Sequence, residues 1–282
     1  MKIVFFGSAS FACESLRLLA ADQRFEILGV VTQPDRPAGR DRSSAPTPVK
    51  EETLKWHIPI FQPEKATDPA LLNQIRFLAP EAIVVAAYGQ IIPPEILRLP
   101  PLGCINIHGS LLPKYRGASP IRWALLNGES QTGVTLIRMD AQIDTGDILA
   151  QQATRIRRRD NFQTLHDRLA VMGAVLLLQT LPLLKDGKIQ PRKQEPSPTS
   201  YARKLTREDA HLDWDNPPLK LWFKIRAFAP TPGAFCLWTN PSGQKLILKI
   251  FEIILSRRAR GKPGEIVRID KHGILVAART GG

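Results

Sequence analysis

The order of apolar and polar positions predicts alternating strands and helices over the N-terminal part of the chain. Five apolar runs have the length of buried strands, at residues 2–6, 27–32, 81–88, 103–108 and 133–139. Two amphipathic stretches, 10–21 and 161–184, have the period of helices. Strands that are apolar on both faces and alternate with helices indicate an α/β fold with a mostly parallel sheet.

The pattern changes after residue 189. Residues 190–208 combine Pro191, Pro196 and Pro198 with polar residues, a composition typical of a linker. Four short alternating runs separated by turn residues follow, at 234–239, 245–254, 264–269 and 273–278. This spacing predicts a small OB-like β-barrel. We therefore expect a catalytic domain at 1–189, a linker at 190–208 and a C-terminal domain at 209–282.

The composition excludes several classes of protein. Hydrophobic residues make up 43% of the 282 residues, enough for a proper core. The first turn, Gly7-Ser-Ala-Ser-Phe-Ala12, lacks the G-x-G-x-x-G spacing of a dinucleotide site, which disfavours a nicotinamide enzyme. The N-terminus is a strand pattern and not a signal peptide, and no run of 18 apolar residues occurs, so we expect no membrane-spanning helix.

The three cysteines, Cys13, Cys104 and Cys236, are far apart and have no metal-ligand spacing. They predict buried thiols in a reducing, cytoplasmic environment and no bound metal.

The chain is strongly basic, with a formal net charge of +13 and a pI of about 10.0. The last 74 residues hold 12 Lys and Arg against 6 Asp and Glu, so the surplus leans toward the C-terminus. Such a surplus favours a polyanionic partner, either nucleic acid or an anionic membrane surface. We interpret it as nucleic-acid binding, against the alternative of a basic surface without a partner.

Two polar side chains end one of the predicted strands, in the segment Asn106-Ile-His108-Gly-Ser-Leu-Leu-Pro113. Strand periodicity puts Asn106 and His108 on one face, and the apolar Ile105 and Ile107 on the other. Open α/β sheets bind their ligands at the carboxyl ends of parallel strands. An Asn amide can donate to a developing oxyanion, and a His exchanges protons near neutral pH. The pair indicates acid–base chemistry, although a single His at a strand end also occurs as a capped, half-exposed residue.

Two further segments add charged groups. Met139-Asp140-Ala-Gln-Ile-Asp144-Thr-Gly146-Asp147 places three carboxylates and a Gly turn after a strand. A carboxylate close to His108 would orient the imidazole and stabilise its charged form. Alone, the segment also fits a solvated acidic turn. Lys114-Tyr-Arg-Gly-Ala-Ser-Pro120 is a loop with two cations that opens a helix, or a plain surface turn.

Together, the three segments resemble the 10-formyltetrahydrofolate-dependent formyltransferases. That family has the pattern Asn-x-His-x-Ser-Leu-Leu-Pro, then a basic Gly-Ala-x-Pro turn, then Asp-x-Gly-Asp. The resemblance implies a Rossmann-like formyltransferase domain with Asn106, His108 and Asp144 as the catalytic residues. It also implies that folate contacts eight residues: Ser110, Leu111, Leu112, Pro113, Tyr88, Gly89, Ile91 and Asp140.

The resemblance extends to the branch of the family that formylates initiator methionyl-tRNA, and it covers essentially the whole chain. It rests on Thr32-Gln-Pro-Asp-Arg-Pro-Ala-Gly-Arg40 followed by Pro48-Val-Lys50, and on the segments 87–93, 201–214 and 225–234. It implies a basic loop and a basic C-terminal domain that contact tRNA phosphates through Arg36, Arg40, Arg42, Lys50, Lys249, Arg257, Arg258 and Arg260. A further basic cluster, Arg155 and Arg157 to Arg159, is interpreted as a solvated strand end.

The sequence departs from the family pattern in two places. After Arg40 it continues Asp41-Arg42-Ser43-Ser44, which is less basic than the family loop. After residue 279 it lacks the family's final strand and short terminal helix, so we expect a barrel with an unpaired edge.

The resemblance implies the reaction. The α-amine of methionine on initiator tRNA attacks the formyl carbon of 10-formyltetrahydrofolate, the cosubstrate, and forms a tetrahedral intermediate. Asn106 would donate to the oxyanion, and His108, supported by Asp144, would move the proton. No metal is needed. We expect a monomer that does not bind membranes.

Family members that act on other acceptors share the residues that correspond to Asn106, His108 and Asp144. Formyltransferases of purine synthesis and formyl-folate hydrolases generally lack a basic C-terminal β-domain, whereas an enzyme acting on a nucleotide-linked amino sugar has a related one. The basic loop and the charge surplus favour tRNA over the sugar. A tRNA-binding protein without catalysis is the alternative from another class, and the intact Asn106, His108 and Asp144 disfavour it.

Overall fold

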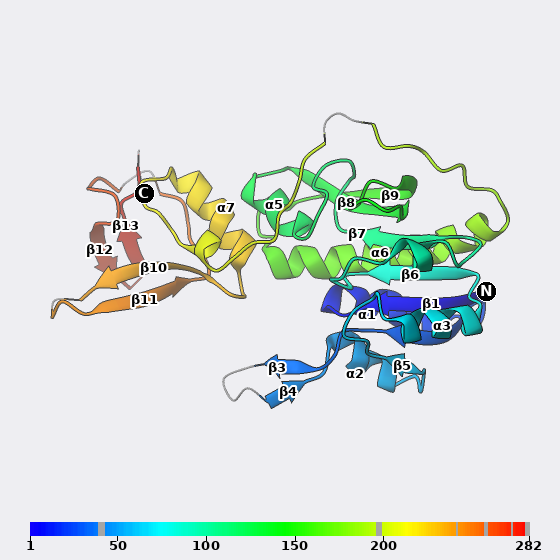
Figure 1. Ribbon diagram of the computed structural model, residues 1–282. Coiled ribbons are helices and arrows are strands. Elements are labelled where there is room, and N and C mark those ends of the chain that lie inside the picture. The colour runs from blue at the N-terminus through cyan, green and yellow to red at the C-terminus, as the bar shows by residue number, and fades with distance from the viewer. Residues whose placement is uncertain (39–42, 196–198, 241, 257–258, 272, 280–282) are drawn as a thin grey trace. The chain divides into compact units, whose positions relative to one another are not determined.

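The computed structural model describes residues 1–38, 43–195, 199–240, 242–256, 259–271 and 273–279. The chain divides into two compact units, which we call unit 1 and unit 2. Unit 1 consists of residues 1–118, 133–154 and 166–202. Unit 2 consists of residues 119–132, 155–165 and those from 203 onward. Figure 1 labels the elements of both units.

Unit 1 is built on a seven-stranded sheet with the order β5-β2-β1-β6-β7-β8-β9. The strands are β1 (Lys2–Gly7), β2 (Glu26–Val31), β5 (Ile60–Phe61), β6 (Ala82–Ala86), β7 (Cys104–His108), β8 (Gln131–Arg138) and β9 (Asp147–Arg155). Pairing is parallel from β5 to β7, and β8 runs antiparallel to β7. The predicted mostly parallel sheet is therefore confirmed, with β5 and β9 as additions that the sequence pattern did not predict.

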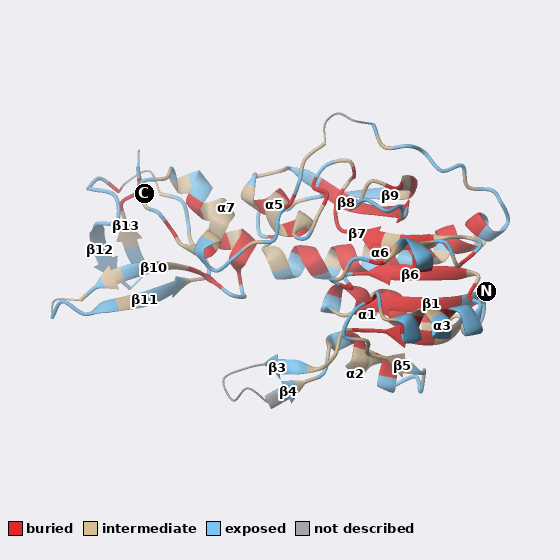
Figure 2. Ribbon diagram, in the orientation of Figure 1, coloured by how far each residue is buried: buried red, intermediate tan, exposed pale blue. Residues whose placement is uncertain are grey.

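The two central strands are buried on both faces. Ile3 and Phe5 point to one side of β1, Val4 and Phe6 point to the other, and all four have no exposed surface. Figure 2 shows β1 and β6 as buried along almost their whole length. Burial on both faces is the reason that these strands are continuous apolar runs and not alternating ones.

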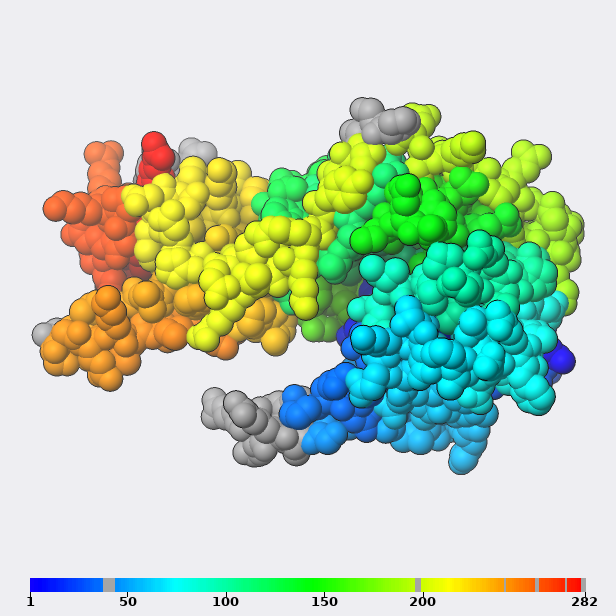
Figure 3. All heavy atoms as spheres, viewed as in Figure 1, coloured from blue at the N-terminus to red at the C-terminus, as the bar shows by residue number. Residues whose placement is uncertain are grey.

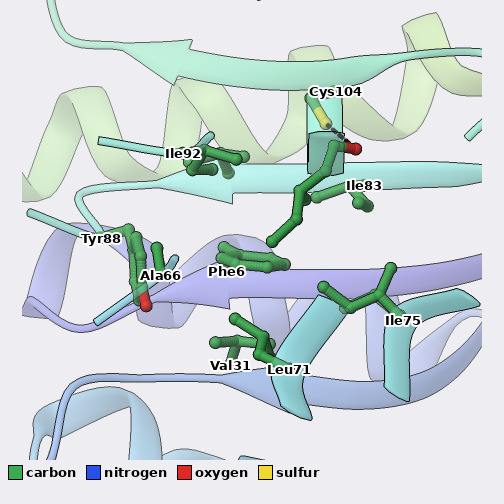
Figure 4. Packing of buried hydrophobic residues seen from close by; sticks show 12 residues of the cluster. Phe6, Val31, Ala66, Leu71, Ile75, Ile83, Tyr88, Ile92 and Cys104 are labelled. Atoms are coloured by element: carbon green, nitrogen blue, oxygen red, sulfur yellow. Dashed lines mark hydrogen bonds between the residues drawn. The ribbon is translucent and has the colours of Figure 1, made fainter. Parts of the chain in front are cut away.

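One face of this sheet packs on a large apolar cluster (Figure 4). The rings of Phe6 and Tyr88 meet edge to face, with centroids 5.2 Å apart and planes at 82°. Ile75 of α3 (Pro69–Leu78) and Ile83 of β6 close the cluster, and each is at most 1% exposed. The cluster fixes β1 and β6 side by side, which matters because the turns after both strands border the site described below.

Two helices of unit 1 begin at a side chain that caps the helix, followed by a proline. The short 3₁₀ turn η1 (Ser10–Ala12) leads into α1 (Cys13–Ala21). Helix α2 (Pro48–Leu54) is capped by the Thr47 side chain, which accepts from the Lys50 amide, and Asp68 caps α3 in the same way through Ala70. The remaining elements are α4 (Pro94–Leu97), α6 (Phe162–Lys185) and the hairpin β3 (Arg36–Ala38) with β4 (Ser43–Ala45).

Helix α6 bears on the expectation that no helix of this chain spans a membrane. With 24 residues, it is long and apolar enough to cross a membrane by length and composition alone. Its apolar face is nevertheless covered by protein, because Leu169, Leu177 and Leu181 have no exposed surface. Gly173 lies against the Ile107 side chain of β7, where an added Cβ would be only 2.7 Å from Ile107 Cγ2. In this structure α6 is a core helix of the sheet, as its one-sided burial requires.

Unit 2 contains α5 (Pro120–Leu126), η2 (Glu208–Ala210), α7 (Pro218–Phe228), β10 (Ala234–Thr239), β11 (Lys245–Ile250), β12 (Ile266–Asp270) and β13 (Gly273–Val276). All four predicted C-terminal strands are present, and they form two antiparallel hairpins, β10–β11 and β12–β13. Within the described residues these hairpins are separate two-stranded sheets, and a bridge between His211 and Phe235 adds a further edge to β10. In the space-filling view the orange β10–β11 hairpin is an exposed part of this unit (Figure 3).

Helices α5 and α7 pack together around one arginine. Arg122 donates to the carbonyl oxygens of Ala227 and Thr231, and its guanidinium carbon lies 3.6 Å from the centroid of the Phe162 ring. Burial lowers the pKa of Arg122 to about 10. Helix α7 was not predicted, although Pro217-Pro218 is a favourable helix start. Its mixed apolar and basic sequence is explained by this packing, which buries Leu221, Ile225 and Phe228.

Candidate active site

The sheet has one point at which the direction of its connections changes. Strand β1 pairs with β2 on one side and with β6 on the other, so successive strands are added outward in opposite directions. Open α/β sheets have a crevice at such a point, at the carboxyl ends of the strands. The turns after β1 and β6 meet there, because the amides of Ser8 and Ala9 both donate to Ala87 O at 3.3 Å.

Strand β7, next to β6, ends at this edge with the two polar residues singled out from the sequence. Ile105 and Ile107 are buried, and Gly173 of α6 approaches Ile107. Asn106 is half-buried and His108 is 5% exposed. The predicted division of the strand into an apolar and a polar face is therefore confirmed.

Asp144 reaches the same place from the loop between β8 and β9, residues 139–146. The loop ends meet where Gly146 lies so close to the Arg138 carbonyl that a Cβ would overlap it. The Asp140 carboxylate accepts from the Gln142 amide at 3.0 Å and from Thr145 Oγ1 at 2.6 Å. Asp144 itself has φ +54°, in the left-handed region that few residues other than Gly, Asn and Asp adopt readily.

The Asp144 carboxylate joins three groups. Its Oδ1 accepts from Asn106 Nδ2 at 3.2 Å, and its Oδ2 accepts from the Gly117 amide at 2.8 Å. Oδ2 also lies 3.6 Å from His108 Nδ1, and the Asp144 side chain is 14% exposed. The amide of Asn106 and the backbone N–H of Gly117 therefore fix the Asp144 carboxylate beside the imidazole. The structure thus brings together Asn106, His108 and Asp144, which are separated by up to 38 positions in the sequence.

The second nitrogen of His108 fixes how the ring is protonated. His108 Nε2 lies 2.9 Å from Tyr115 O, and because a carbonyl only accepts, Nε2 carries a hydrogen. Nδ1 is then the nitrogen that faces Asp144 and can gain or lose a proton. This arrangement has the three parts of an acyl-transfer site: a proton carrier, its supporting carboxylate and an amide donor.

The segment 110–113 follows β7 and is held by two side chains from the neighbouring strands. Thr135 Oγ1 donates to Ser110 O at 2.6 Å and accepts from the Leu112 amide at 3.0 Å. Gln151 Nε2 donates to Leu112 O at 2.9 Å. Ser110 and Leu112 are buried, whereas Leu111 and Pro113 are half-buried. No pattern in the sequence distinguishes Thr135 or Gln151, since each lies in an otherwise ordinary strand.

The segment 88–91, which the resemblance also assigns to folate, presents its backbone rather than its aromatic ring. Tyr88 is 2% exposed, and Figure 4 shows its ring in the core cluster beside Ala66 and Phe6. Burial raises the pKa of Tyr88 to about 12, and its hydroxyl has no hydrogen-bond partner among the described residues. Gly89 follows with φ +82°, and Ile91 is 75% exposed. Any contact with folate at position 88 would therefore come from the main chain.

The sequence-predicted basic contacts fall into three groups. In unit 1, Arg36 pairs with Glu64, and Lys50 pairs with Asp35 at 2.6 Å. In unit 2, Lys249 and Arg260 are exposed. Arg40, Arg42, Arg257 and Arg258 lie outside the described residues.

The thiols are unpaired, as expected, but not all are buried. Cys104 and Cys236 are buried, and Cys13 is only partly so. Burial raises the pKa of Cys104 to about 12 and that of Cys13 to about 11. In the part of the chain that the structure describes, no group of three potential metal-ligating side chains is found.

Sequence reasoning missed a group of residues in the segment interpreted as a linker. Gln194 contacts the Asp144 loop and Arg116, and Ser200 bonds the backbone next to Arg116. Their sequence context is Pro-rich and polar, and nothing in it distinguishes a contact residue from a solvated one.

The fold and the site define a formyl transferase. Residues 1–181 match the family model described as formyl transferase, and residues 204–282 match the model of the formyl transferase C-terminal domain. A solved N-formyltransferase from Helicobacter canadensis, in complex with folinic acid and dTDP-3-aminofucose, has the same fold, with a TM-score of 0.68 and 18% identity. That comparison covers 100% of this chain and 97% of the other.

The closer relatives specify the branch. The methionyl-tRNA formyltransferase of Methylacidiphilum infernorum is 49% identical over 100% of this chain and 88% of its own length. That of Geobacter sulfurreducens is 44% identical over 100% of this chain and 86% of its own length. The chain belongs to the methionyl-tRNA formyltransferase family.

Proposed function

We propose that the protein transfers the formyl group of 10-formyltetrahydrofolate to the α-amine of methionine on initiator tRNA, through Asn106, His108 and Asp144. The observation that carries the assignment of these residues is their convergence: one buried carboxylate holds the amide of Asn106 and faces Nδ1 of His108. Their position beside the switch point of the sheet is the usual ligand position of this fold. Family membership supports the donor, the acceptor and the reaction.

The transfer needs a nucleophile, an oxyanion donor and a proton carrier. The amine nitrogen attacks the formyl carbon, a C–N bond forms, and the carbonyl π electrons move to the oxygen. Asn106 Nδ2 uses one hydrogen for Asp144, and its second hydrogen is available for that oxyanion. His108 takes the amine proton at Nδ1 and returns it to N10 of the folate as the C–N10 bond breaks. The imidazolium formed in between is stabilised by Asp144 at 3.6 Å.

The folate is proposed to lie along residues 110–113, with further contacts at Gly89, Ile91 and Asp140. Two observations support this position. Thr135 and Gln151 hold the backbone of residues 110–112 in place, so that it forms one fixed side of the site. Ile91 is a large apolar side chain that is 75% exposed, as expected of a residue that an aromatic ligand would cover.

The tRNA is proposed to be held through its phosphates by the basic residues of both units. Lys249 and Arg260 are exposed, and cations that face solvent can exchange counterions for phosphates. Arg36 and Lys50 already pair with carboxylates, so they would contribute less unless these pairs open. We propose a monomer that works in the cytoplasm, where charged tRNA is made; sedimentation at micromolar concentration tests the oligomeric state.

The decisive experiment offers one formyl donor and several acceptors. Purified protein is mixed with 10-formyltetrahydrofolate and either methionyl initiator tRNA, a nucleotide-linked amino sugar or water alone. We expect N-formylmethionyl-tRNA, and we expect its formation to be abolished by His108→Ala. Product on the sugar alone would contradict the proposed acceptor. Free formate without an acceptor product would contradict the transferase assignment, and unchanged donor in every tube would contradict catalysis.

A further inference from the structure

We infer that Gln194 is a positioning residue of the active site, which holds the Asp144 loop in its catalytic conformation. This inference rests on the proposed role of Asp144. Gln194 lies in the segment after α6 and about 50 positions away from Asp144 in the sequence. Among the described residues, the hydrogen bonds of its side chain go to Arg116 and to the carbonyl oxygens of Asp144 and Gly146, so we expect it to act on catalysis through the loop.

The Gln194 amide connects two parts of the site. Its Nε2 donates to Asp144 O and to Gly146 O, both at 2.8 Å. Its Oε1 accepts from Arg116 Nε at 3.0 Å and from Arg116 Nη2 at 2.7 Å. The guanidinium can only donate and the two carbonyls can only accept, so the amide fits in one orientation. Both hydrogens and the oxygen are therefore fully used.

The backbone on either side of Gln194 is attached at both ends. Arg192 exchanges two backbone hydrogen bonds with Ile148 of β9, at 2.7 and 2.9 Å. Ser200 O accepts from the Arg116 amide at 2.8 Å, and Ser200 Oγ accepts from the Tyr115 amide at 2.9 Å. Tyr115 O in turn is the partner of His108 Nε2. Ala202 N donates to Arg116 O at 2.6 Å. We call Arg192, Gln194, Ser200 and Ala202 the strap, because they bind both loops that converge on the Asp144–His108 pair.

An external hold matters here because Asp144 has a left-handed backbone at the point where its carboxylate must face His108. Asp144 adopts φ +54°, a conformation that Asp tolerates better than most residues and that the surrounding hydrogen bonds keep in place. Gln194 donates to the carbonyl of this residue and to that of Gly146, where the loop closes on Arg138. Losing these two bonds would let Asp144 rotate away from His108. A displacement of about 1 Å at a catalytic group can cost on the order of 10² in rate.

Two substitutions separate the parts of this role. Gln194→Met keeps the length and loses the amide, and Gln194→Glu keeps an oxygen for Arg116 but puts a second oxygen against two carbonyls. We expect both to lower kcat about 10- to 100-fold, as a displaced catalytic group does, with KM for folate and for tRNA within about threefold. Hydrogen exchange of a peptide spanning 140–147 should become faster in both variants. Thr180→Val is the control, because it removes a hydrogen bond to Leu176 O in α6, away from the site.

The outcomes are separable. A kcat near that of the unaltered protein in Gln194→Met, or a loss in Thr180→Val as large as that in Gln194→Met at a similar drop in Tm, would overturn the strap role. A full rate in Gln194→Glu would overturn it as well, since only the Arg116 contact survives there. If the unaltered protein formylates no acceptor, the proposed function fails, and the hydrogen-exchange comparison still decides whether Gln194 holds the loop.

A second inference comes from a different region, the turn that joins β9 to α6 within unit 2. Arg157 N donates to Asp160 Oδ2 at 2.6 Å, and the Arg226 guanidinium donates to Arg157 O at 2.8 Å and to Asp160 O at 2.6 Å. Arg226 also lies over the Trp222 ring, 4.3 Å from its centroid. The Asp160 side chain and the Arg226 guanidinium therefore fix the backbone of this turn. Arg158 and Arg159 are exposed at its tip, and neither forms an ion pair with a described residue.

The two arginines border a hollow of about 610 Å³. Its wall contains flat apolar groups from Trp222 and Phe251, the Asn161 amide and one carboxylate, Glu252. Phe251 is 51% exposed. Unpaired guanidinium groups beside aromatic faces are the pattern that recognises a nucleic-acid strand, by phosphate contacts and by stacking. The geometry points to a phosphate-contact site for the RNA acceptor, at residues that the sequence analysis had interpreted as a solvated strand end.

Salt dependence tests this site directly. The double variant Arg158→Gln and Arg159→Gln should raise KM for methionyl initiator tRNA and lower the slope of log KM against log salt by about 1.4–1.8, or 0.7–0.9 per phosphate contact. Its kcat and its KM for folate should be unchanged. Arg76→Gln with Arg98→Gln, two exposed cations of unit 1, is the matched control.

An unchanged slope in the Arg158 and Arg159 variant, or an equal change in the Arg76 and Arg98 control, would overturn the site. If the unaltered protein fails to formylate tRNA, the proposed function fails first. Filter binding of uncharged initiator tRNA then still compares the two double variants.

Discussion

The two units differ in where they keep their polar groups. In unit 1 the polar groups proposed to carry the chemistry are buried beside one another: His108 is 5% exposed and the Asp144 side chain is 14% exposed. In unit 2 the strands are mostly exposed, and β12 is exposed along its whole length (Figure 2). The effect of buried polar groups depends on their exact positions. The effect of exposed cations depends on how many there are and on their total charge, because each interaction is weakened by solvent and salt. The first region should therefore respond sharply to single substitutions and the second only gradually.

The largest effect is expected at the buried polar pair. Asn106→Ala and His108→Ala should each lower kcat about 10²–10³-fold, as the loss of an oxyanion-type donor does. Folate binding should remain within a few-fold, because neither side chain belongs to residues 110–113. Stopped-flow turnover and folate fluorescence titration measure the two quantities. Asn73→Ala, an exposed Asn of α3, is the control, and a near-normal kcat in either site variant would refute the assignment.

Stability should show the same contrast between units. Ile83→Ala in β6 removes a side chain without exposed surface, and should lower the free energy of unfolding by about 2–5 kcal/mol. Ile269→Ala in β12 removes one that is 70% exposed, and should change it by less than about 0.5 kcal/mol. Urea unfolding followed by circular dichroism compares them. Similar losses for both variants would show that β12 is covered in solution.

Substitution of Tyr88 should raise the free energy of unfolding, by less than Ile83→Ala lowers it. Its buried hydroxyl has no partner among the described residues, so Tyr88→Phe should stabilise the folded protein by about 1–3 kcal/mol. The pKa of this phenol is raised from 10.0 to about 12, so the unfolded chain ionises first as the pH rises. Stability is therefore full below pH 10 and falls between pH 10 and 12, and Tyr88→Phe should lose that alkaline decline. Tyr201→Phe, at a side chain that is 71% exposed, should do neither, and an unchanged Tm for Tyr88→Phe would refute the prediction.

The smallest effects are expected at single exposed cations of unit 2. Lys249→Gln and Arg260→Gln should each raise KM for tRNA by about two- to fourfold, and each should lower the salt slope by about 0.7–0.9. The kcat should be unchanged, because Lys249 and Arg260 are exposed cations of unit 2, whereas the buried pair belongs to unit 1. Formylation at several salt concentrations measures both. A change in kcat with unchanged KM would contradict a role in phosphate contact.

The strand pattern and the chemistry of the site could be predicted from the sequence for a physical reason. A strand buried on both faces must be apolar throughout, and a strand with a functional face must alternate, so β1, β6 and β7 each carry a readable period. Asn106 and His108 follow from that period directly. Placing Asp144 beside them required the resemblance to a known family, since loop geometry leaves no period in the sequence.

The features that could not be predicted from the sequence depend on contacts between residues far apart in the chain. Helix α7 is mixed in character because one of its residues, Arg226, donates to the carbonyl oxygens of Arg157 and Asp160 inside unit 2. Gln194 has a role only because Arg116 and Gly146 happen to lie on either side of it. Of the predicted barrel, the described residues form the four strands as two separate hairpins, because strand lengths can be read from turns whereas pairing between hairpins cannot.

The left-handed backbone of Asp144 limits how this position can change during evolution. A carboxylate for the chemistry and a positive φ for the loop are both required of one residue. Gly and Asn accept the backbone and lose the carboxylate, and Glu keeps the carboxylate but is poorly suited to that backbone. Every single-step neighbour therefore fails one of the two requirements. A substitution at position 144 that keeps activity would therefore require the surrounding loop to change as well.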